Sequence, residues 1–210
     1  MEWIYQAPIL FFSVVFHEFA HGYAAHLSGD DTAYHSGRLT LNPLPHIDFF
    51  GTILLPVICY AANLPLFGWA KPVPVNPLRF YNFRRDMLKV AASGPASNLL
   101  LVLIAAGLIS LSRFVVGSSF SLLLAKALTF AVTVNLVLAF FNLIPVAPLD
   151  GSKVLGALLP RNLAISYEKH TPYGMWILLG LMATGLIKYL IVPPLMVSLY
   201  LLAKAGLPLL

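Results

Sequence analysis

Long apolar runs separated by short polar segments dominate the pattern of this chain. A run of about 20 apolar residues is long enough to cross the hydrocarbon core of a bilayer as a helix. Such runs predict candidate spans at about Trp3–Leu27, Phe49–Leu66, Met87–Leu111, Phe120–Leu143 and Tyr173–Ile191. The last apolar stretch, Pro194–Leu202, is too short to span comfortably.

Two segments between these runs have the pattern of extended chain. Ser36–Pro43 alternates in polarity and is bounded by glycine and proline. Gly68–Pro77 carries prolines at alternate positions, which remove backbone donors and push their neighbours into extended geometry. We therefore expect short β-strand segments, which near a membrane must be buried in protein or line a watery cavity.

Composition assigns the chain to the integral membrane proteins. Its 210 residues are 59% hydrophobic and 10% charged, whereas a soluble domain carries about 25% charge. This length allows a single membrane-embedded domain over residues 1–210. The net charge of +5 is scattered between the apolar runs instead of being gathered on one stripe, which argues against nucleic-acid binding.

The basic residues predict an orientation in the membrane. They cluster between Arg79 and Lys89 and between Lys153 and Lys169, while residues 112–119 carry little positive charge. The positive-inside rule places both clusters in the cytoplasm and residues 112–119 outside. If Trp3 is also outside, Phe49–Leu66 must enter and leave on the same side, as a re-entrant hairpin.

The first apolar run carries ionisable residues at a defined spacing, His17-Glu18-Phe19-Ala20-His21. In a helix, His17 and His21 stand on one face and can bind one Zn²⁺, and Glu18 beside them can take a proton from a water. Ionisable groups inside a membrane span are costly and indicate function. The motif therefore predicts zinc-dependent hydrolysis in the membrane, with Glu18 as the catalytic base.

A catalytic zinc needs three protein ligands and one open position, so a third donor must come from elsewhere. Asp150 differs from the other candidates because it stands at the end of an apolar run, where Pro145 and Pro148 break the helix and Gly151 permits a sharp turn. A carboxylate there can point back into the bundle. The other candidates lie mostly in polar loops: Glu2, Asp30, Asp31, Asp48, Asp86, Glu168, His26, His35, His46 and His170.

Motifs along most of the chain resemble the site-2 protease family of intramembrane zinc metalloproteases, especially its compact members without PDZ-like or nucleotide-sensing domains. They are His17–His21, Gly37–Pro43, Gly68–Val75, Gly94–Asn98 and Asn142–Gly151. The resemblance implies that Asp150 is the third zinc ligand and that Asn142 faces the same site. Ser152 departs from the family, which often has a second glycine there, but it still supports a turn. We expect Gly94–Asn98 to shape a close helix contact more than to do chemistry.

The expected fold is an all-α polytopic membrane protein, a bundle of about five transmembrane helices with a re-entrant hairpin and short β-strand segments near the active site. The helix runs about 21 Å from Trp3 to His17, which predicts a zinc site in the cytoplasmic third of the bilayer. The multi-pass protein is expected in the cytoplasmic membrane of a prokaryote.

The expected function is hydrolysis of peptide bonds within or next to transmembrane segments of membrane-protein substrates, with one Zn²⁺ per chain. A helical substrate must unwind before attack, and Lys71, Pro72 and Val73 are expected to pair with the unwound strand by edge addition. Asn142 is expected to bind the substrate backbone or the developing oxyanion. The expected partners are transmembrane substrates and the lipid bilayer, without nucleic acid.

Two other functions are compatible with the zinc motif. A membrane zincin of the prenyl-protein-processing type would take its third ligand from a downstream glutamate, for which Glu168 is the only candidate. A zinc-binding transporter or scaffold without catalysis would not need Glu18 beside the ligands. Transporters usually show internal repeats or several charged spans, and the sequence displays neither.

Overall fold

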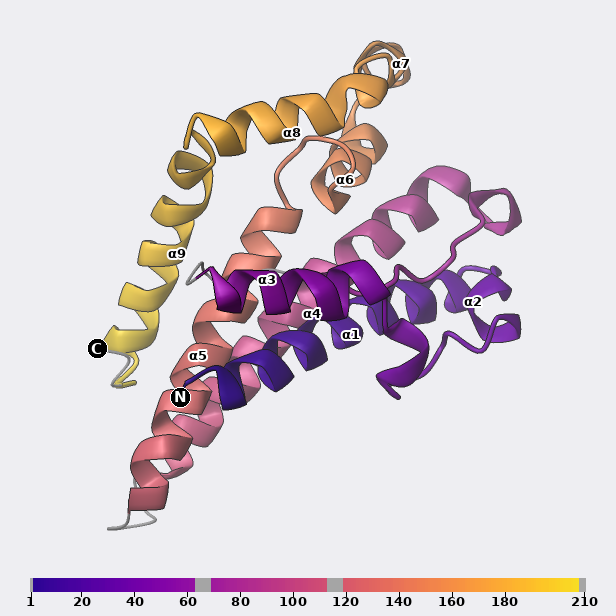
Figure 1. Ribbon diagram of the computed structural model, residues 1–210. Helices are drawn as coiled ribbons and strands as arrows, with labels where there is room; N and C mark the ends of the chain where they lie inside the picture. The colour runs from indigo at the N-terminus through magenta and orange to yellow at the C-terminus, as the bar shows by residue number, and fades with distance from the viewer. Residues whose placement is uncertain (1, 63–68, 113–118, 208–210) are drawn as a thin grey trace.

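The computed structural model describes residues 2–62, 69–112 and 119–207, and most of them lie in helices (Figure 1). These residues contain no β-strand, so the prediction of an all-α chain is confirmed for them. The α-helices are α1 (Trp3–Leu27), α2 (Thr32–His35), α3 (Leu55–Ala61), α4 (Phe83–Ser112), α5 (Ser119–Asn142), α6 (Asp150–Leu158), α7 (Arg161–Glu168), α8 (Gly174–Ala183) and α9 (Ile187–Lys204).

Four single-turn or irregular helices connect them. A π-helix, η2 (Phe49–Leu54), leads into α3, and three 3₁₀ turns complete the set: η1 (Leu44–His46), η3 (Pro77–Arg79) and η4 (Thr171–Tyr173).

Three of the described helices are long and apolar enough to cross a membrane: Phe83–Ser112, Leu122–Asn142 and Ile187–Lys204. Helix α1 has the predicted bounds, but the polar residues of the zinc motif lower its mean hydropathy and it is not among the three. The expected number of five spans is therefore not confirmed. The predicted external loop falls largely on residues 113–118, which lie outside the described residues.

The predicted span Tyr173–Ile191 is wrong, because the chain turns within it. Gly185 has a φ of +69°, and the N–H groups of Thr184 and Gly185 donate to carbonyls of the preceding turn. A glycine directly after an apolar helix is a common termination signal, which hydropathy alone does not register. The stretch predicted as too short to span instead belongs to α9, a helix of 18 residues.

The segment after residue 48 lies beside the N-terminal half of α1. Tyr60 of α3 contacts Trp3, with ring centroids 5.4 Å apart, and residues 63–68 lie outside the described residues. Beyond them the N–H of Trp69 donates to the carbonyl of Gly51 (3.2 Å), and the Thr52 hydroxyl donates to the carbonyl of Trp69 (2.9 Å). The start of the segment at Gly51 and Thr52 therefore meets its end at Trp69, as a re-entrant hairpin requires. The position of this hairpin in the membrane stays a prediction.

Neither predicted β-strand forms within the described residues. Ser36–Pro43 is a series of turns that contains Gly37 at a φ of +67°. The segment 69–76 has no regular secondary structure, and its backbone bonds to isolated groups, such as the carbonyl of His46, instead of to a neighbouring strand. The guanidinium of Arg38 donates to the carbonyls of Lys71 (3.3 Å) and Pro72 (2.9 Å).

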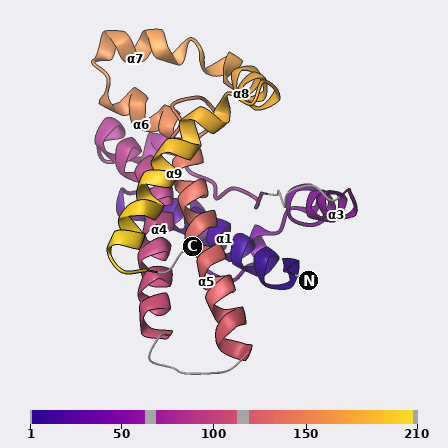
Figure 2. The same ribbon diagram turned by 90° about the vertical axis from the view of Figure 1, so that its left-hand side faces the viewer.

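Helix α4 is the centre of the structure and packs against α5, α1 and α6 (Figure 1). The main apolar core lies between α4 and α5, with residues of α9 packed against it. Figure 2 shows α4 and α5 side by side, with α6, α7 and α8 crossing one end of the pair. A smaller cluster of Ile144, Leu149 and Leu178 ties the α5–α6 connection to α8. This packing brings α1 and the start of α6 against the same face of α4.

Candidate active site

His17 and His21 occupy one face of α1 and are both buried against α4. The i, i+4 spacing stacks them along the helix, with ring centroids 4.6 Å apart. Glu18 follows His17 and therefore points to a different side of α1. The local geometry expected of the motif is present.

Asp150 reaches the histidines from the start of α6. Helix α5 ends at Asn142, and Asp150 is the first residue of the next helix, which places its carboxylate at a helix N-terminus, where the dipole favours negative charge. Gly151 is needed in this turn, because a Cβ there would collide with the carbonyl of Leu143. The sequence suggested a carboxylate at the end of a helix, and the structure assigns it instead to the beginning of one.

Three ligand atoms converge on one point. Asp150 Oδ2 lies 3.1 Å from Nε2 of His17 and 3.0 Å from Nε2 of His21, and the two nitrogens are 3.0 Å apart. Neighbouring ligands on a tetrahedral zinc are separated by about 3.3 Å. The donor set and its spacing therefore fit one Zn²⁺, with the fourth position left to water or substrate.

The other ring nitrogens are already engaged, which leaves both Nε2 atoms free for the metal. Nδ1–H of His17 donates to Oδ1 of Asn98 (2.6 Å), and Nδ1–H of His21 donates to the carbonyl of Val90 (2.7 Å). Such outer partners fix the tautomer and orientation of metal-binding histidines. Two nitrogen lone pairs and a carboxylate would repel one another unless a cation lies between them.

Asn98 belongs to a buried polar network that joins α1, α4 and α5. Its Nδ2 donates to Oδ1 of Asn135 (2.8 Å) and to the carbonyl of Ser13 (3.3 Å), and Nδ2 of Asn135 donates to the hydroxyl of Ser13 (2.9 Å). All three side chains are at most 1% exposed. The sequence predicts only helix packing for Asn98 and indicates no role for Asn135 or Ser13. The signal was three polar residues inside apolar helices.

Gly94 allows α4 to approach the two histidines. A Cβ at this position would lie 2.6 Å from Cε1 of His17 and would also collide with the ring of His21. The expectation that Gly94–Asn98 shapes a close helix contact is therefore correct, and the contact is with the ligand pair itself. The same motif thus supplies both the space for the histidines and the acceptor for one of them.

Glu18 lies in the same cavity as the ligands and is held by the extended segment. The backbone N–H of Val73 donates to its Oε2 (2.8 Å). The catalytic cavity has a volume of about 420 Å³ and is lined by His17, Glu18, His21, Asp150, Asn142, Pro72, Val73, Val75 and neighbouring residues of α4 and α6. Glu18 and the three candidate metal ligands are therefore exposed to a common space.

The expected substrate-binding residues differ in their placement. Asn142, Pro72 and Val73 line the catalytic cavity, whereas Lys71 does not. Asn142 donates from Nδ2 to the carbonyl of Leu138 on its own helix (3.0 Å). The N–H groups of Lys71 and Val73 are both used within the protein, and Pro72 has none. The carbonyls of Lys71 and Pro72 already accept from Arg38, so at these residues the segment offers a substrate strand apolar contact and no backbone donor.

Asp30 fixes the far end of the extended segment. Its fully buried carboxylate accepts from the N–H of Asn76 (2.6 Å) and from the N–H (3.1 Å) and hydroxyl (2.5 Å) of Thr32. Burial raises the pKa of Asp30, but these hydrogen bonds and the charge of Arg79 outweigh burial and hold the pKa below its usual value. An ionised Asp30 thus connects the end of α1 to the segment that carries Val73.

Comparison with known proteins gives the family. The sequence profile described as "Peptidase family M50" matches residues 106–183, a stretch that contains Asn142 and Asp150. A protein of Bacillus subtilis (strain 168) named "Putative zinc metalloprotease YwhC" is 39% identical over 192 residues, which cover 90% of this chain and 84% of that protein. No solved structure matches the chain. The similarity extends over most of both sequences, and the chain therefore belongs to peptidase family M50, the site-2 protease family of zinc metalloproteases.

Proposed function

We propose that this protein is an intramembrane zinc metalloprotease that hydrolyses peptide bonds within or next to transmembrane segments of membrane-protein substrates. The observation that carries the proposal is the convergence of His17, His21 and Asp150, with ligand atoms 3.0–3.1 Å apart in a cavity that Glu18 also lines. Family membership and the three apolar helices support a membrane metallopeptidase. Regulated intramembrane proteolysis is the corresponding cellular role.

His17, His21 and Asp150 would hold the metal, and Glu18 would move the proton. A zinc ion at this site supplies Lewis-acid activation of the scissile carbonyl and of the attacking water. The carboxylate of Glu18 accepts a proton from that water and passes it to the nitrogen of the leaving amine. The N–H of Val73 keeps the carboxylate in one orientation, so that it is in position before the substrate arrives.

Substrate is expected to enter the catalytic cavity as an unwound strand. Pro72 and Val75 would contact it through apolar side chains, and Asn142 would donate its remaining amide proton to the substrate backbone. The backbone donors of Lys71 and Val73 are already used, which favours side-chain contact over edge addition at these residues.

We propose that the active site lies toward the cytoplasmic side of a prokaryotic cell membrane. His21 bonds to Val90, which is seven residues, or about 10 Å, from the start of α4. The basic residues Arg84, Lys153 and Arg161 line one cavity at that same end. This common location agrees with a cytoplasmic assignment for both basic clusters.

The two alternatives are less consistent with the geometry. Glu168 is exposed at the end of α7 and is not one of the three grouped ligands, so a zincin that uses it as third ligand is disfavoured. A zinc carrier or scaffold would give no reason for Glu18 to line the ligand cavity in a fixed orientation.

The test separates zinc binding from catalysis in purified protein. Wild type, Glu18→Gln and the control Glu168→Gln are reconstituted in vesicles with a single-span substrate, and cleavage and zinc content are measured. We expect wild type and the control to cleave. Glu18→Gln should keep about one zinc per chain and lose cleavage, with a drop of at least about 100-fold. Cleavage by Glu18→Gln at the wild-type rate would exclude the assigned base.

A comparison of membrane proteomes from cells that carry wild type or Glu18→Gln then identifies the substrate as a protein that accumulates uncut in the variant.

A further inference from the structure

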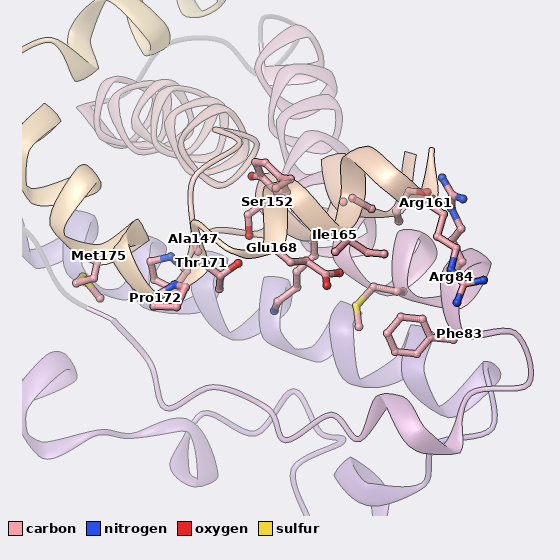
Figure 3. A pocket seen from close by; sticks show the side chains of 17 residues that line it. Phe83, Arg84, Ala147, Ser152, Arg161, Ile165, Glu168, Thr171, Pro172 and Met175 are labelled. Carbon is pink, nitrogen blue, oxygen red and sulfur yellow. Dashed lines mark hydrogen bonds between the residues drawn. The ribbon is translucent and has the colours of Figure 1, made fainter. Parts of the chain in front are cut away.

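A second cavity adjoins the catalytic cavity and has about twice its volume, about 860 Å³ against about 420 Å³. It lies between the start of α4, helices α6 and α7, and the start of α8 (Figure 3). Met87, Pro148 and Lys153 line both cavities, so the two are neighbours. The proposed proteolysis needs only the smaller one.

The second cavity has an apolar wall and a basic end. Much of its lining is apolar and comes from Phe83, Met87, Ala147, Pro148, Ile165 and Met175. Figure 3 shows Arg84 and Arg161 together at the end of the cavity near Phe83, with Met175 toward the opposite end. Glu168 is the only acidic side chain that lines it among the described residues. Lys153 lies where the two cavities adjoin, 3.9 Å from Asp150, so the cavity is amphiphilic with its two arginines together at one end.

The turn between α6 and α7 determines the positions of both arginines. The side chain of Arg84 donates from Nε to the carbonyl of Ala157 (2.5 Å) and from Nη2 to the carbonyl of Leu159, at the end of α6. Arg161 opens α7 two residues later. In the described part of the chain, neither arginine forms an ion pair. Two cations without an acidic partner at the end of an apolar cavity favour an anionic ligand.

The cavity lies at the level where two candidate spans end. Arg84 is the second residue of α4, and Ala147 follows the end of α5. Tyr173 and Trp176, at the start of α8, are 64% and 74% exposed. Exposed tyrosine and tryptophan side chains concentrate at the height of the lipid headgroups. These aromatic residues adjoin Met175, and Arg84 at the other end of the cavity stands at the start of a candidate span, so the cavity as a whole lies at the boundary between the membrane and the headgroup layer.

We propose that this cavity binds one anionic phospholipid. The phosphate lies against Arg84 and Arg161, and an acyl chain follows the apolar wall past Ile165 toward Met175. Basic pockets beside membrane helices bind anionic headgroups in this way. A free phosphate would use only the arginine end and would leave the apolar wall without a partner, so the shape of the cavity favours the lipid over a soluble phosphate.

Lipid binding is measured by native mass spectrometry of the full chain in detergent, which does not depend on proteolysis. The probes are short-chain phosphatidylglycerol, phosphatidylcholine of the same chain length, and glycerol 3-phosphate. The test variants are Arg161→Gln at the basic end and Ile165→Asn in the apolar wall. Arg85→Gln is the matched control, because Arg85 neighbours Arg84 in sequence but does not line the cavity. Zinc content and circular dichroism report folding.

We expect phosphatidylglycerol to bind wild type and Arg85→Gln equally, and Arg161→Gln about fivefold more weakly, the loss expected for one interfacial cation. Ile165→Asn should weaken phosphatidylglycerol but not glycerol 3-phosphate. Equal binding by Arg161→Gln and wild type, or equal weakening by Arg85→Gln, would overturn the proposal. Binding of phosphatidylcholine as tight as that of phosphatidylglycerol in wild type would do so even if Arg161→Gln failed to fold. Glycerol 3-phosphate binding as tightly as the lipid would make this a site for soluble phosphate instead.

Discussion

The side-chain oxygen of Asn98 lies 2.6 Å from Nδ1 of His17, and this contact determines which nitrogen of the ligand is free. The Ser13 hydroxyl donates to the carbonyl of Ile9, so its oxygen accepts from Nδ2 of Asn135. The oxygen of Asn135 then accepts from Nδ2 of Asn98, which turns the oxygen of Asn98 toward His17. A one-directional chain of hydrogen bonds thus keeps the proton on Nδ1 and the lone pair of Nε2 directed at the metal site.

Removing this acceptor should weaken zinc binding. We expect Asn98→Ala to lower the zinc affinity about 10- to 100-fold, because His17 loses the partner that sets its tautomer. Ser97→Ala is the control, since the Ser97 hydroxyl bonds only within α4, to the carbonyl of Gly94. Zinc retention is measured during titration with a chelator. Equal retention by Asn98→Ala and wild type would show that Asn98 only packs the helices.

The three candidate metal ligands could be singled out from the sequence because their signals are local. His17 and His21 follow from helical periodicity, and Asp150 stands out by its place at the end of an apolar run, while its role as third ligand was implied by the resemblance to the site-2 protease family. The roles of Asn98 and Asn135 depend on which faces of α1, α4 and α5 meet, and hydropathy along the chain does not contain that information. Their polarity inside apolar helices was the only available sign.

The errors in the fold have local physical causes. Gly185 interrupts an apolar run that hydropathy treats as continuous, so one predicted span became two helices. The prolines of the segment 69–76 correctly predicted non-helical chain. The predicted β-strand segments are absent from the described residues, and at Lys71 and Pro72 the carbonyls bond to the side chain of Arg38 instead of to a neighbouring strand.

A methyl group at position 94 should disrupt the site while leaving the helix intact. Gly94→Ala would press on His17 and His21, and overpacking of this kind costs about 1–3 kcal/mol. We expect loss of zinc and of cleavage. Gly107→Ala is the control on the same helix, because a Cβ there has no atom within 4 Å outside its local helix, and it should raise stability slightly. Metal analysis and thermal unfolding separate the two effects. Full zinc in Gly94→Ala would mean that α4 can shift away.

The backbone N–H of Val73 should matter for turnover more than its side chain does. Val73→Pro removes the donor to Glu18, and we expect zinc to remain while kcat falls about tenfold, because the base is no longer held in place. Val73→Ala keeps the donor and removes packing against Gly22, so it should affect stability more than kcat. Kinetics with a single-span substrate and metal analysis measure both. A common loss of zinc in the two variants would make the segment structural.

Cysteine labelling tests the orientation. In a Cys59→Ser background, a cysteine introduced by Asn82→Cys at the start of α4 should react with a membrane-impermeant thiol reagent from the cytoplasmic face only. The reason is the positive charge of Arg79, Arg84 and Arg85 beside it. Lys126→Cys, near the opposite end of the α4–α5 pair, should react from the external face. Labelling of Asn82→Cys from outside only would make Phe49–Leu66 a true span.

Acid should weaken the fold through Asp30. Its pKa is lowered in the folded protein, because hydrogen bonds from Thr32 and Asn76 and the charge of Arg79 outweigh burial, which alone would raise it. A carboxylate with a lowered folded-state pKa stabilises the protein fully above its unfolded-state pKa of about 3.9. That contribution disappears as the pH falls through the lower folded-state value.

We therefore expect Asp30→Asn to lower the midpoint of thermal unfolding by about 3–10 °C at pH 7, since hydrogen bonds to a buried charge are lost. The difference from wild type should begin to shrink as the pH is lowered from 5 toward 3, because the Asp30 carboxyl of the unfolded chain then takes up protons, and it should go on shrinking as the pH falls through the lower folded-state pKa. Glu168→Gln is the control, because Glu168 is exposed and the substitution removes one carboxylate without touching Thr32 or Asn76. The measurement is thermal unfolding in detergent across this pH series. If the difference between Asp30→Asn and wild type stayed constant down to pH 3, Asp30 would act through packing alone. Such a result would contradict the stabilising role of the ionised carboxylate, because that contribution must decrease as the carboxylate takes up a proton.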